Sequence, residues 1–201
     1  MRNRISHIAY RISFKISFLL LAISYLPFAI LGCGYTTRSM LSTKYKTIYI
    51  MPFINTIDIT KETDVASKYK VYRPKLESDI TTAVTNKYLF DGNLRPAKKE
   101  RADLVLKGEL VEYRRDPLRY TDGDEVAEYR MNLIVNISLW DNREDKLLWE
   151  EKGFTGYFQY FTDRYPLTNE PRFSDSDDQT PLSKALEDLA RRVVERTVNE
   201  W

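Results

Sequence analysis

The chain has 201 residues, with 31 basic and 29 acidic side chains, one cysteine (Cys33) and one histidine (His7). Its first 32 residues hold four of the basic side chains, the histidine and no acidic side chain, so residues 33–201 carry a net charge of −2. That part therefore has no histidine and only one thiol, which argues against a zinc site and excludes the Ser-His-Asp and Cys-His nucleophile arrangements and a histidine general base. Its near-neutral charge argues against a nucleic acid partner, and we expect neither a metal nor a cofactor.

Residues 1–32 have the organisation of a secretory signal peptide, with a basic start, an apolar run over residues 16–31 and a glycine before Cys33. The run is shorter than the roughly 20 residues that span a bilayer, and Pro27 interrupts it. The sequence Ile-Leu-Gly-Cys-Gly resembles the bacterial lipobox, in which the cysteine receives acyl chains such as palmitate and becomes the new N-terminus. We therefore predict that residues 1–32 are cleaved and that Cys33 is lipidated, rather than a buried structural cysteine or part of an uncleaved anchor. Aspartate after the cysteine favours the inner membrane in such lipoproteins, so Gly34 predicts a lipid anchor in the outer membrane, on the periplasmic side.

The remaining chain is predicted to be a lipidated tether over residues 33–44 and one domain over residues 45–201. The 11 residues after the cysteine reach at most about 40 Å when extended, which keeps the domain near the membrane. Residues 45–53 (YKTIYIMPF) are β-branched and aromatic and predict a strand. Residues 54–73 mix polar and apolar side chains and are predicted to be a loop.

A helix is predicted from Pro74, which suits a first helical turn, to the Asp-Gly-Asn sequence at residues 91–93. Its apolar side chains recur at helical spacing and indicate a face packed on the core: Leu76, Ile80, Ala83, Val84 and Tyr88. A short strand over residues 94–96 and a solvated basic connector over residues 98–101 follow.

A long β-hairpin is the most strongly predicted element. Apolar side chains alternate with polar ones over residues 104–110 and again over residues 129–139, and Asp122-Gly123 between them suits a two-residue type I′ turn. With Thr121 facing Asp124 in such a turn, three apolar pairs would share one buried face: Leu110 with Val135, Gly108 with Ile137 and Leu106 with Leu139.

The same register would place Arg115 opposite Arg130 on the other face of the hairpin. Like charges in direct opposition destabilise a sheet. One interpretation is a solvated, charge-mixed hairpin tip, in which Glu112, Asp116 and Glu128 neutralise the arginines. The other is a site for an anion such as a lipid phosphate, formed by four basic side chains: Arg115, Arg130, Arg119 and Lys107.

The C-terminal part predicts a strand, a loop and a helix. Residues 147–160 are dense in aromatic side chains and predict the last strand, and residues 161–180 predict a long polar loop. Thr180 and Pro181 suit the N-cap and first turn of a final helix. Its predicted apolar face comprises Leu182, Ala185, Leu186, Leu189, Val193 and Thr197.

Five stretches, in this order after the lipobox, resemble the LptE-like lipopolysaccharide-assembly lipoproteins. They are Cys33-Gly34-Tyr35, residues 47–56 (TIYIMPFINT), residues 101–110 (RADLVLKGEL), residues 128–131 (EYRM) and residues 146–150 (KLLWE). The resemblance implies an α+β fold, a two-layer sandwich with two helices packed on one face of a four-stranded mixed, mostly antiparallel sheet. It also implies an outer-membrane lipoprotein, not an enzyme, that plugs an LptD-like β-barrel translocon, binds lipopolysaccharide through basic residues on the sheet and assists its delivery to the cell surface.

Two other functions remain open from the residues alone. A similar strand–helix opening occurs in other outer-membrane lipoproteins, such as homo-oligomeric channel subunits resembling those of curli secretion. A glycan-cleaving enzyme would need two carboxylates that converge in a cleft, whereas the acidic residues here are scattered over polar faces.

Overall fold

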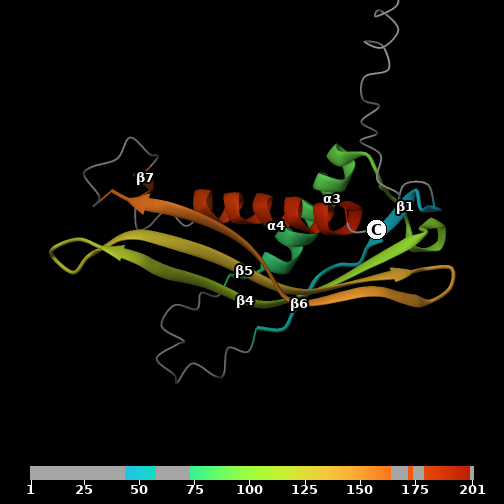
Figure 1. Ribbon diagram of the computed structural model, residues 1–201, viewed down its shortest axis with the longest axis horizontal. Helices are drawn as coiled ribbons and strands as arrows, with labels where there is room; N and C mark the ends of the chain where they lie inside the picture. Colours follow the sequence, from blue (N-terminus) through green and yellow to red (C-terminus); the bar gives the residue numbers. More distant parts are fainter. Residues whose placement is uncertain (1–43, 58–72, 164–171, 174–178, 200–201) are drawn as a thin grey trace, which may run out of the picture. The chain divides into compact units, whose positions relative to one another are not determined.

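The computed structural model describes residues 44–57, 73–163, 172–173 and 179–199. Two helices, α3 (Leu76–Asp91) and α4 (Gln179–Asn199), accompany a single mixed sheet in this part of the chain (Figure 1). Neither helix is long and apolar enough to cross a membrane. The strands are β1 (Thr47–Ile50), β2 (Ile54–Asn55), β3 (Arg95–Pro96), β4 (Leu104–Tyr120), β5 (Val126–Asp141), β6 (Lys146–Thr162) and β7 (Arg172–Phe173).

The predicted class, α+β with two helices and a mixed sheet, is confirmed, but the prediction of four strands is wrong. The strand order is β3-β1-β4-β5-β6-β7, and β2 pairs with β4 beyond β1. Because β1 and β2 follow each other along the same edge of β4, the seven described strands occupy six positions. Strands β4, β5 and β6 pair antiparallel, whereas β1, β2, β3 and β7 pair parallel with their neighbours. The three extra strands are the two-residue ones, β2, β3 and β7. β3 lies in the short strand predicted over residues 94–96, whereas β2 and β7 lie in stretches predicted to be loops.

The hairpin of β4 and β5 follows the predicted register at its base only. Leu110 pairs with Val135, Gly108 with Ile137 and Leu106 with Leu139, as predicted. Val111 has no partner in β5. Beyond it the pairing is shifted by one residue, so that Glu112 lies opposite Ile134. A β-bulge of this kind reverses which residues of a strand face the core.

The turn of the hairpin explains the shift. The backbone N–H of Thr121 donates to the carbonyl of Glu125 at 2.7 Å, and the N–H of Asp124 donates to the carbonyl of Thr121 at 3.1 Å. The loop therefore has three residues instead of the predicted two, and Asp124, with φ of 59°, takes the left-handed position in place of a glycine. The bulge at Val111 compensates for the longer loop, so both ends of the hairpin keep their apolar side chains on one face.

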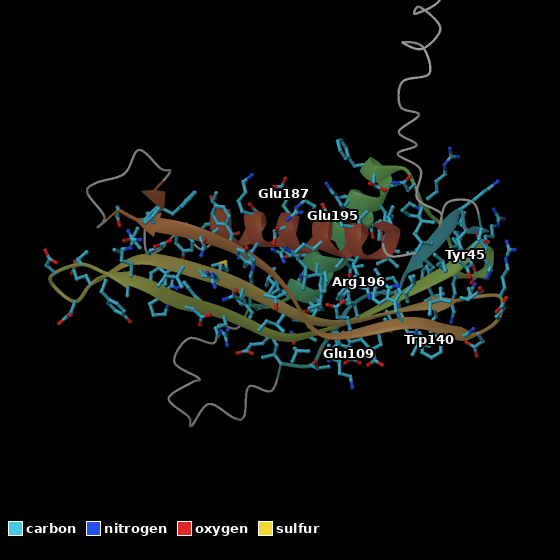
Figure 2. The ribbon with its side chains drawn as sticks, in the orientation of Figure 1. Tyr45, Glu109, Trp140, Glu187, Glu195 and Arg196 are labelled. Carbon is cyan, nitrogen blue, oxygen red and sulfur yellow. The ribbon has the colours of Figure 1, made fainter. Side chains whose placement is uncertain are left out.

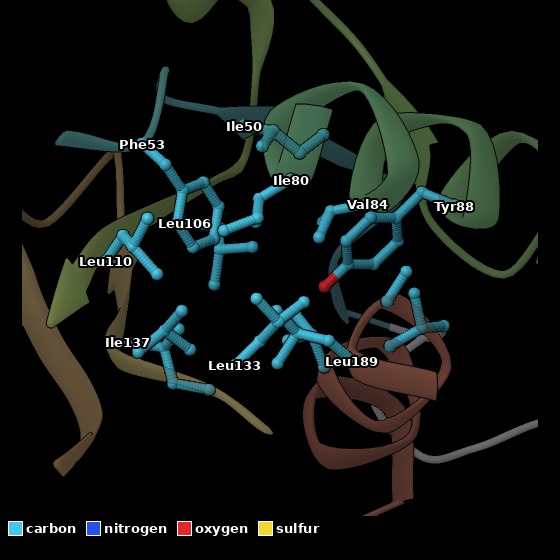
Figure 3. Close-up of a cluster of buried hydrophobic side chains, with 14 of the residues drawn as sticks. Ile50, Phe53, Ile80, Val84, Tyr88, Leu106, Leu110, Leu133, Ile137 and Leu189 are labelled. Atoms are coloured by element: carbon cyan, nitrogen blue, oxygen red, sulfur yellow. The ribbon is translucent and has the colours of Figure 1, made fainter. Parts of the chain in front are cut away.

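The core is built from buried side chains of both helices and of the sheet. The helical spacing predicted for α3 is confirmed, because Leu76, Ile80, Val84 and Tyr88 are fully buried. Figure 3 shows this face of α3 directed at side chains of β1, β4 and β5 and at Leu189 of α4. The phenol of Tyr88 donates a hydrogen bond of 2.8 Å to Thr197 Oγ1, and neither side chain is exposed. This bond joins the two helices inside the core.

Helix α4 lies close against β6. A Cβ atom at Gly156 would lie 2.4 Å from Leu189 Cβ and 2.5 Å from Leu189 Cα, which is far below ordinary contact. The neighbouring backbone N–H of Tyr157 donates to Asp188 Oδ2 at 3.0 Å. The glycine thus allows the helix backbone to approach the strand, and the aspartate satisfies an N–H at the strand's outer edge.

Candidate functional site

The site residues predicted from the sequence lie mainly on the face of the sheet turned away from the core, which we call the distal face. Along β5 the buried residues Met131, Leu133 and Val135 alternate with residues that point to this face: Arg130, Asn132, Ile134 and Asn136. Figure 2 shows Glu109 and Trp140 on this face and Glu187 and Glu195 on helix α4. In the described part of the chain, no group of His, Cys, Asp and Glu side chains could hold a metal ion. Cys33, the predicted lipidation site, lies outside the described residues.

Arg130 is held on the distal face by neutral and aromatic groups. Its guanidinium carbon lies 5.4 Å from the ring centroid of Tyr157. With its amide oxygen turned towards the arginine, Gln159 accepts hydrogen bonds from Nε at 3.1 Å and Nη2 at 2.6 Å. Arg130 forms no ion pair with any described carboxylate. Because guanidinium groups bind phosphates in a bidentate fashion, this arrangement leaves a full positive charge that suits an anionic ligand.

Asp116 is the residue directly opposite Arg130 across the β4–β5 pair, but it is engaged elsewhere. Its Oδ2 accepts from Arg114 Nε at 2.9 Å and from Asn132 Nδ2 at 2.8 Å. Glu112 also lies 3.8 Å from Arg114. The structure thus places Arg114 on the distal face, about 7–8 Å diagonally from Arg130, with its charge largely neutralised by two carboxylates.

The prediction that Arg115 lies opposite Arg130 is wrong. Arg115 pairs with Met131, and its guanidinium carbon lies 4.5 Å from the ring centroid of Tyr129. Both partners belong to the face of β5 that is turned towards the core. The bulge at Val111 is the physical cause, because one extra residue exchanges the faces of Arg114 and Arg115.

The other two predicted basic residues lie on the distal face at different distances from Arg130. Arg119 pairs with Glu128, two residues from Arg130 on β5, and its Nε lies 3.6 Å from the glutamate carboxylate. Lys107 is nine residues along β4 from Asp116, the residue opposite Arg130, which corresponds to roughly 30 Å. Its Nζ lies 3.9 Å from the ring centroid of Trp140 and borders a separate pocket of about 340 Å³. The four predicted residues therefore do not form one site.

Tyr157 and Arg192 belong to the surroundings of Arg130 but were missed by the sequence analysis. The guanidinium carbon of Arg192, on α4, lies 4.7 Å from the Tyr157 ring centroid, so two arginines from distant parts of the chain contact one ring. The aromatic density of residues 147–160 was the only signal for Tyr157. No sequence pattern relates Arg192 to the sheet, because the contact depends on how α4 packs at the edge of β6.

A second polar cluster lies where β1 begins. Asp103 Oδ2 accepts hydrogen bonds from the backbone N–H groups of Lys46 at 2.9 Å and Thr47 at 3.1 Å and from Thr47 Oγ1 at 2.9 Å, and Arg143 pairs with Oδ1. Burial acts to raise the pKa of Asp103, but these hydrogen bonds and the Arg143 charge outweigh it, so the pKa lies below its usual value. The cluster fixes the start of β1 against the adjacent strand.

Asp141 has a related position beside this cluster. Its Oδ2 accepts from the Tyr45 hydroxyl at 2.7 Å and lies 3.8 Å from Lys44 Nζ. Its Oδ1 accepts from the backbone N–H groups of Arg143 and Glu144. Here too burial acts to raise the pKa, and the Tyr45 hydrogen bond, the backbone donors and the Lys44 charge lower it below the usual value. Both buried carboxylates are therefore structural groups whose bonding capacity is already used.

Several solved structures have a similar but distant fold. A PelC dodecamer subunit from Paraburkholderia phytofirmans is 14% identical, with a TM-score of 0.43 over 82% of this chain and 96% of that one. An uncharacterized lipoprotein B from Nitrosomonas europaea is 12% identical, with a TM-score of 0.47 over 83% and 91% of the two chains. The rare lipoprotein B from Shewanella oneidensis is 15% identical, with a TM-score of 0.44 over 76% and 93%. No curated protein matches the sequence.

The model of the lipopolysaccharide-assembly family LptE matches residues 45–199, which include all of the strands and helices described above. The match identifies the class of protein: a non-enzymatic, lipid-anchored lipoprotein of the cell envelope that acts in lipopolysaccharide transport and outer-membrane assembly. The chain belongs to the LptE family, and the resemblance predicted from the sequence is confirmed.

Proposed function

We propose that the protein is anchored by acylated Cys33 to the outer membrane on its periplasmic side, plugs an LptD-like β-barrel and binds lipopolysaccharide during its delivery to the cell surface. Family membership supports the general role, and the lipobox supports the anchor. The two-layer arrangement implied by the resemblance is part of the proposal. It is supported by a core that α3, α4 and one face of the sheet share, which leaves the distal face available for a ligand.

The environment of Arg130 is the observation that carries the ligand proposal. Lipopolysaccharide presents phosphate groups next to sugars and acyl chains, so its recognition needs a cation beside aromatic or apolar surface. Arg130 supplies a guanidinium group that pairs with none of the carboxylates the structure describes, and Tyr157, 39% exposed, supplies the adjoining aromatic ring. Arg119 adds a second guanidinium group nearby, which is paired with Glu128 and lies 5.9 Å from the Phe161 ring centroid.

Replacing Arg130 with glutamate tests this site. A charge-assisted hydrogen bond to phosphate is worth about 1.5–3 kcal/mol, so Arg130→Glu should weaken binding of purified lipopolysaccharide at least about tenfold. The matched control is Arg115→Glu, which removes the same charge from the same hairpin but on the opposite face. Equal binding by the Arg130 variant and the wild type, or an equal loss in the control, would contradict the proposal.

The barrel partner requires a separate experiment. Affinity purification of the full lipoprotein from detergent-solubilised outer membranes should recover a β-barrel protein in a constant ratio. Recovery of the lipoprotein alone, or as a homo-oligomeric ring, would exclude the plug function and favour a channel subunit.

A further inference from the structure

Two large apolar side chains at the end of α3 are exposed to a degree that the core does not explain. Phe90 is 87% exposed and Leu89 is 64% exposed, the two highest values among the described large hydrophobic side chains. They follow Tyr88, the last residue of the buried face of α3. Adjacent exposed aromatic and aliphatic side chains of this size are typical of surfaces that bind a partner or a membrane interface.

This end of α3 lies close to the start of β1. Helix α3 ends at Asp91, and only four residues separate Phe90 from Arg95, so the two Cα atoms are at most about 17 Å apart. The backbone N–H of Arg95 donates to the carbonyl of Lys46 at 2.9 Å. Figure 1 shows the loop after α3 running to β1. The exposed apolar pair and the first described residues of the domain therefore share one edge.

Basic side chains are concentrated at the same edge. All six are exposed, and we call them the cationic edge: Lys44, Lys46, Arg95, Lys98, Lys99 and Arg101. Two hydrogen bonds bring them together: the backbone N–H of Ala97 donates to the carbonyl of Ile48 at 2.9 Å, and the Thr47 side-chain hydroxyl donates to the carbonyl of Arg101 at 3.2 Å.

The carboxylates near the cationic edge do not neutralise it. Asp103 and Asp141 are buried and already bonded. Asp141 pairs with Lys44, whereas Asp103 pairs with Arg143 and accepts only the backbone N–H of Lys46 from the edge. Within the described residues, the other five cations form no ion pair. The exposed acidic residues nearest to the edge are Asp91 and Glu100 in sequence, and Glu144 and Asp145 on the adjoining turn between β5 and β6, where the Asn142 side chain donates to the carbonyl of Lys99 at 2.8 Å. The six cations outnumber these four carboxylates.

We propose that the cationic edge, with Leu89 and Phe90, docks the domain on the surface of an anionic phospholipid bilayer. The proposal goes beyond lipopolysaccharide binding and rests on the proposed anchor at Cys33. Eleven residues separate that cysteine from the domain, so the acyl chains hold this edge within about 40 Å of the membrane. Lipid phosphates complement its charge, while an aromatic and an aliphatic side chain suit the headgroup boundary.

The charge pattern favours a lipid surface over a second copy of the chain as the occupant. A symmetric dimer through this edge would bring two sets of six cations together, and such like-charge contact is unfavourable. An anionic lipid surface attracts these cations instead of repelling them, and each cation near it raises the ratio of docked to undocked protein about fivefold.

The test uses the full acylated lipoprotein in vesicles of phosphatidylethanolamine and phosphatidylglycerol. Because acylation occupies the thiol of the chain's only cysteine, Leu89→Cys introduces one reactive thiol for a bimane fluorophore. Nitroxide-labelled lipids should quench this fluorophore strongly. The positional control is Asp122→Cys, at the hairpin turn roughly 50 Å along β4 from the cationic edge, where quenching should be weak.

Charge is tested in the same assay. Lys98→Glu combined with Lys99→Glu should lower the docked-to-undocked ratio at least about 25-fold. The matched control reverses two exposed lysines elsewhere, Lys152→Glu with Lys184→Glu, and should leave quenching at position 89 unchanged. Circular dichroism checks that each variant is folded.

Four results would overturn the proposal. The first is equal quenching at positions 89 and 122, and the second is equal quenching in vesicles of phosphatidylcholine alone. The third is a shift of the bimane emission that occurs without vesicles and grows with protein concentration. The fourth is a shift of the bimane emission that requires a co-purified β-barrel protein. The third would indicate a second copy and the fourth a barrel as the occupant. Intact-mass measurement reports acylation independently, so failure of the anchor is distinguishable from failure of docking.

Discussion

Replacing Gly156 with alanine tests the close approach of α4 to β6. The new Cβ would lie 2.4 Å from Leu189 Cβ, 2.5 Å from its Cα and 2.7 Å from its N. Carbon atoms in contact are normally 3.5–4.0 Å apart, so helix and strand would have to separate by about 1 Å. No rotamer change can relieve the clash, because two of these three atoms belong to the helix backbone.

The expected cost follows from this geometry. Overpacking a core costs about 1–3 kcal/mol, and the upper part of that range applies where the backbone must move. Alanine restricts the unfolded chain and returns about 0.4–1 kcal/mol. The net loss in the free energy of unfolding should therefore be about 2 kcal/mol, which lowers Tm by about 4–8 °C in a domain of this size.

Thermal and urea unfolding followed by circular dichroism measure this loss. Gly123→Ala is the matched control, because its nearest neighbouring side-chain atom would be 3.8 Å from the new Cβ and the change should stay within about 0.5 kcal/mol. Equal Tm values for the two alanine variants would show that α4 does not lie against β6 at this distance.

Three further predictions concern buried hydrogen bonds, a charged group and the hairpin turn. Tyr88→Phe removes the buried hydrogen bond to Thr197 and should cost about 1 kcal/mol, whereas Thr197→Val leaves the phenol without its acceptor and should cost more; urea unfolding that ranks them the other way would contradict this. The pKa of Asp103 is lowered in the folded state, so its stabilisation is present above the unfolded pKa of about 3.9 and is lost as the pH falls through the folded value. Asp103→Asn should therefore lower Tm at pH 7 and match the wild type more closely below about pH 4, and a Tm difference that is independent of pH would disprove the role of its charge. Asp124→Val places a β-branched residue at φ of 59° and should cost about 1–2 kcal/mol, and an unchanged urea midpoint would exclude the three-residue turn.

The hairpin shows how far periodicity reaches. Alternation over residues 104–110 and 129–139 predicts the pairing of Leu110 with Val135, because a one-residue slip there would expose every apolar side chain. Beyond Val111 the strand is mostly polar, so no burial pattern fixes its register. The turn length and the bulge then decide the pairing, and Asp122-Gly123 is compatible with a two-residue or a three-residue loop.

The candidate site depended on that undetermined part. Sequence analysis named Arg130 and Arg119 correctly as residues of the distal face, but it placed Arg115 on that face, where the structure has Arg114. It also could not relate Arg192 to Tyr157, because that contact joins a helix and a strand through tertiary packing. The number of strands was underestimated for a similar reason, since two-residue strands such as β2 have too few side chains to show alternation.

By itself the sequence determined the class of fold, the core faces of α3 and α4, the LptE family and the expectation of a lipid anchor at Cys33. These features depend on local patterns: helical spacing, strand alternation and a short motif. Only the tertiary structure decided which arginine on the distal face is unpaired among the described carboxylates and which surface lies at the start of β1. Those results depend on one bulge, one three-residue turn and the packing of α4. Each is decided by contacts between residues far apart in the sequence, and because proteins are only marginally stable, small differences in free energy are enough to select one arrangement.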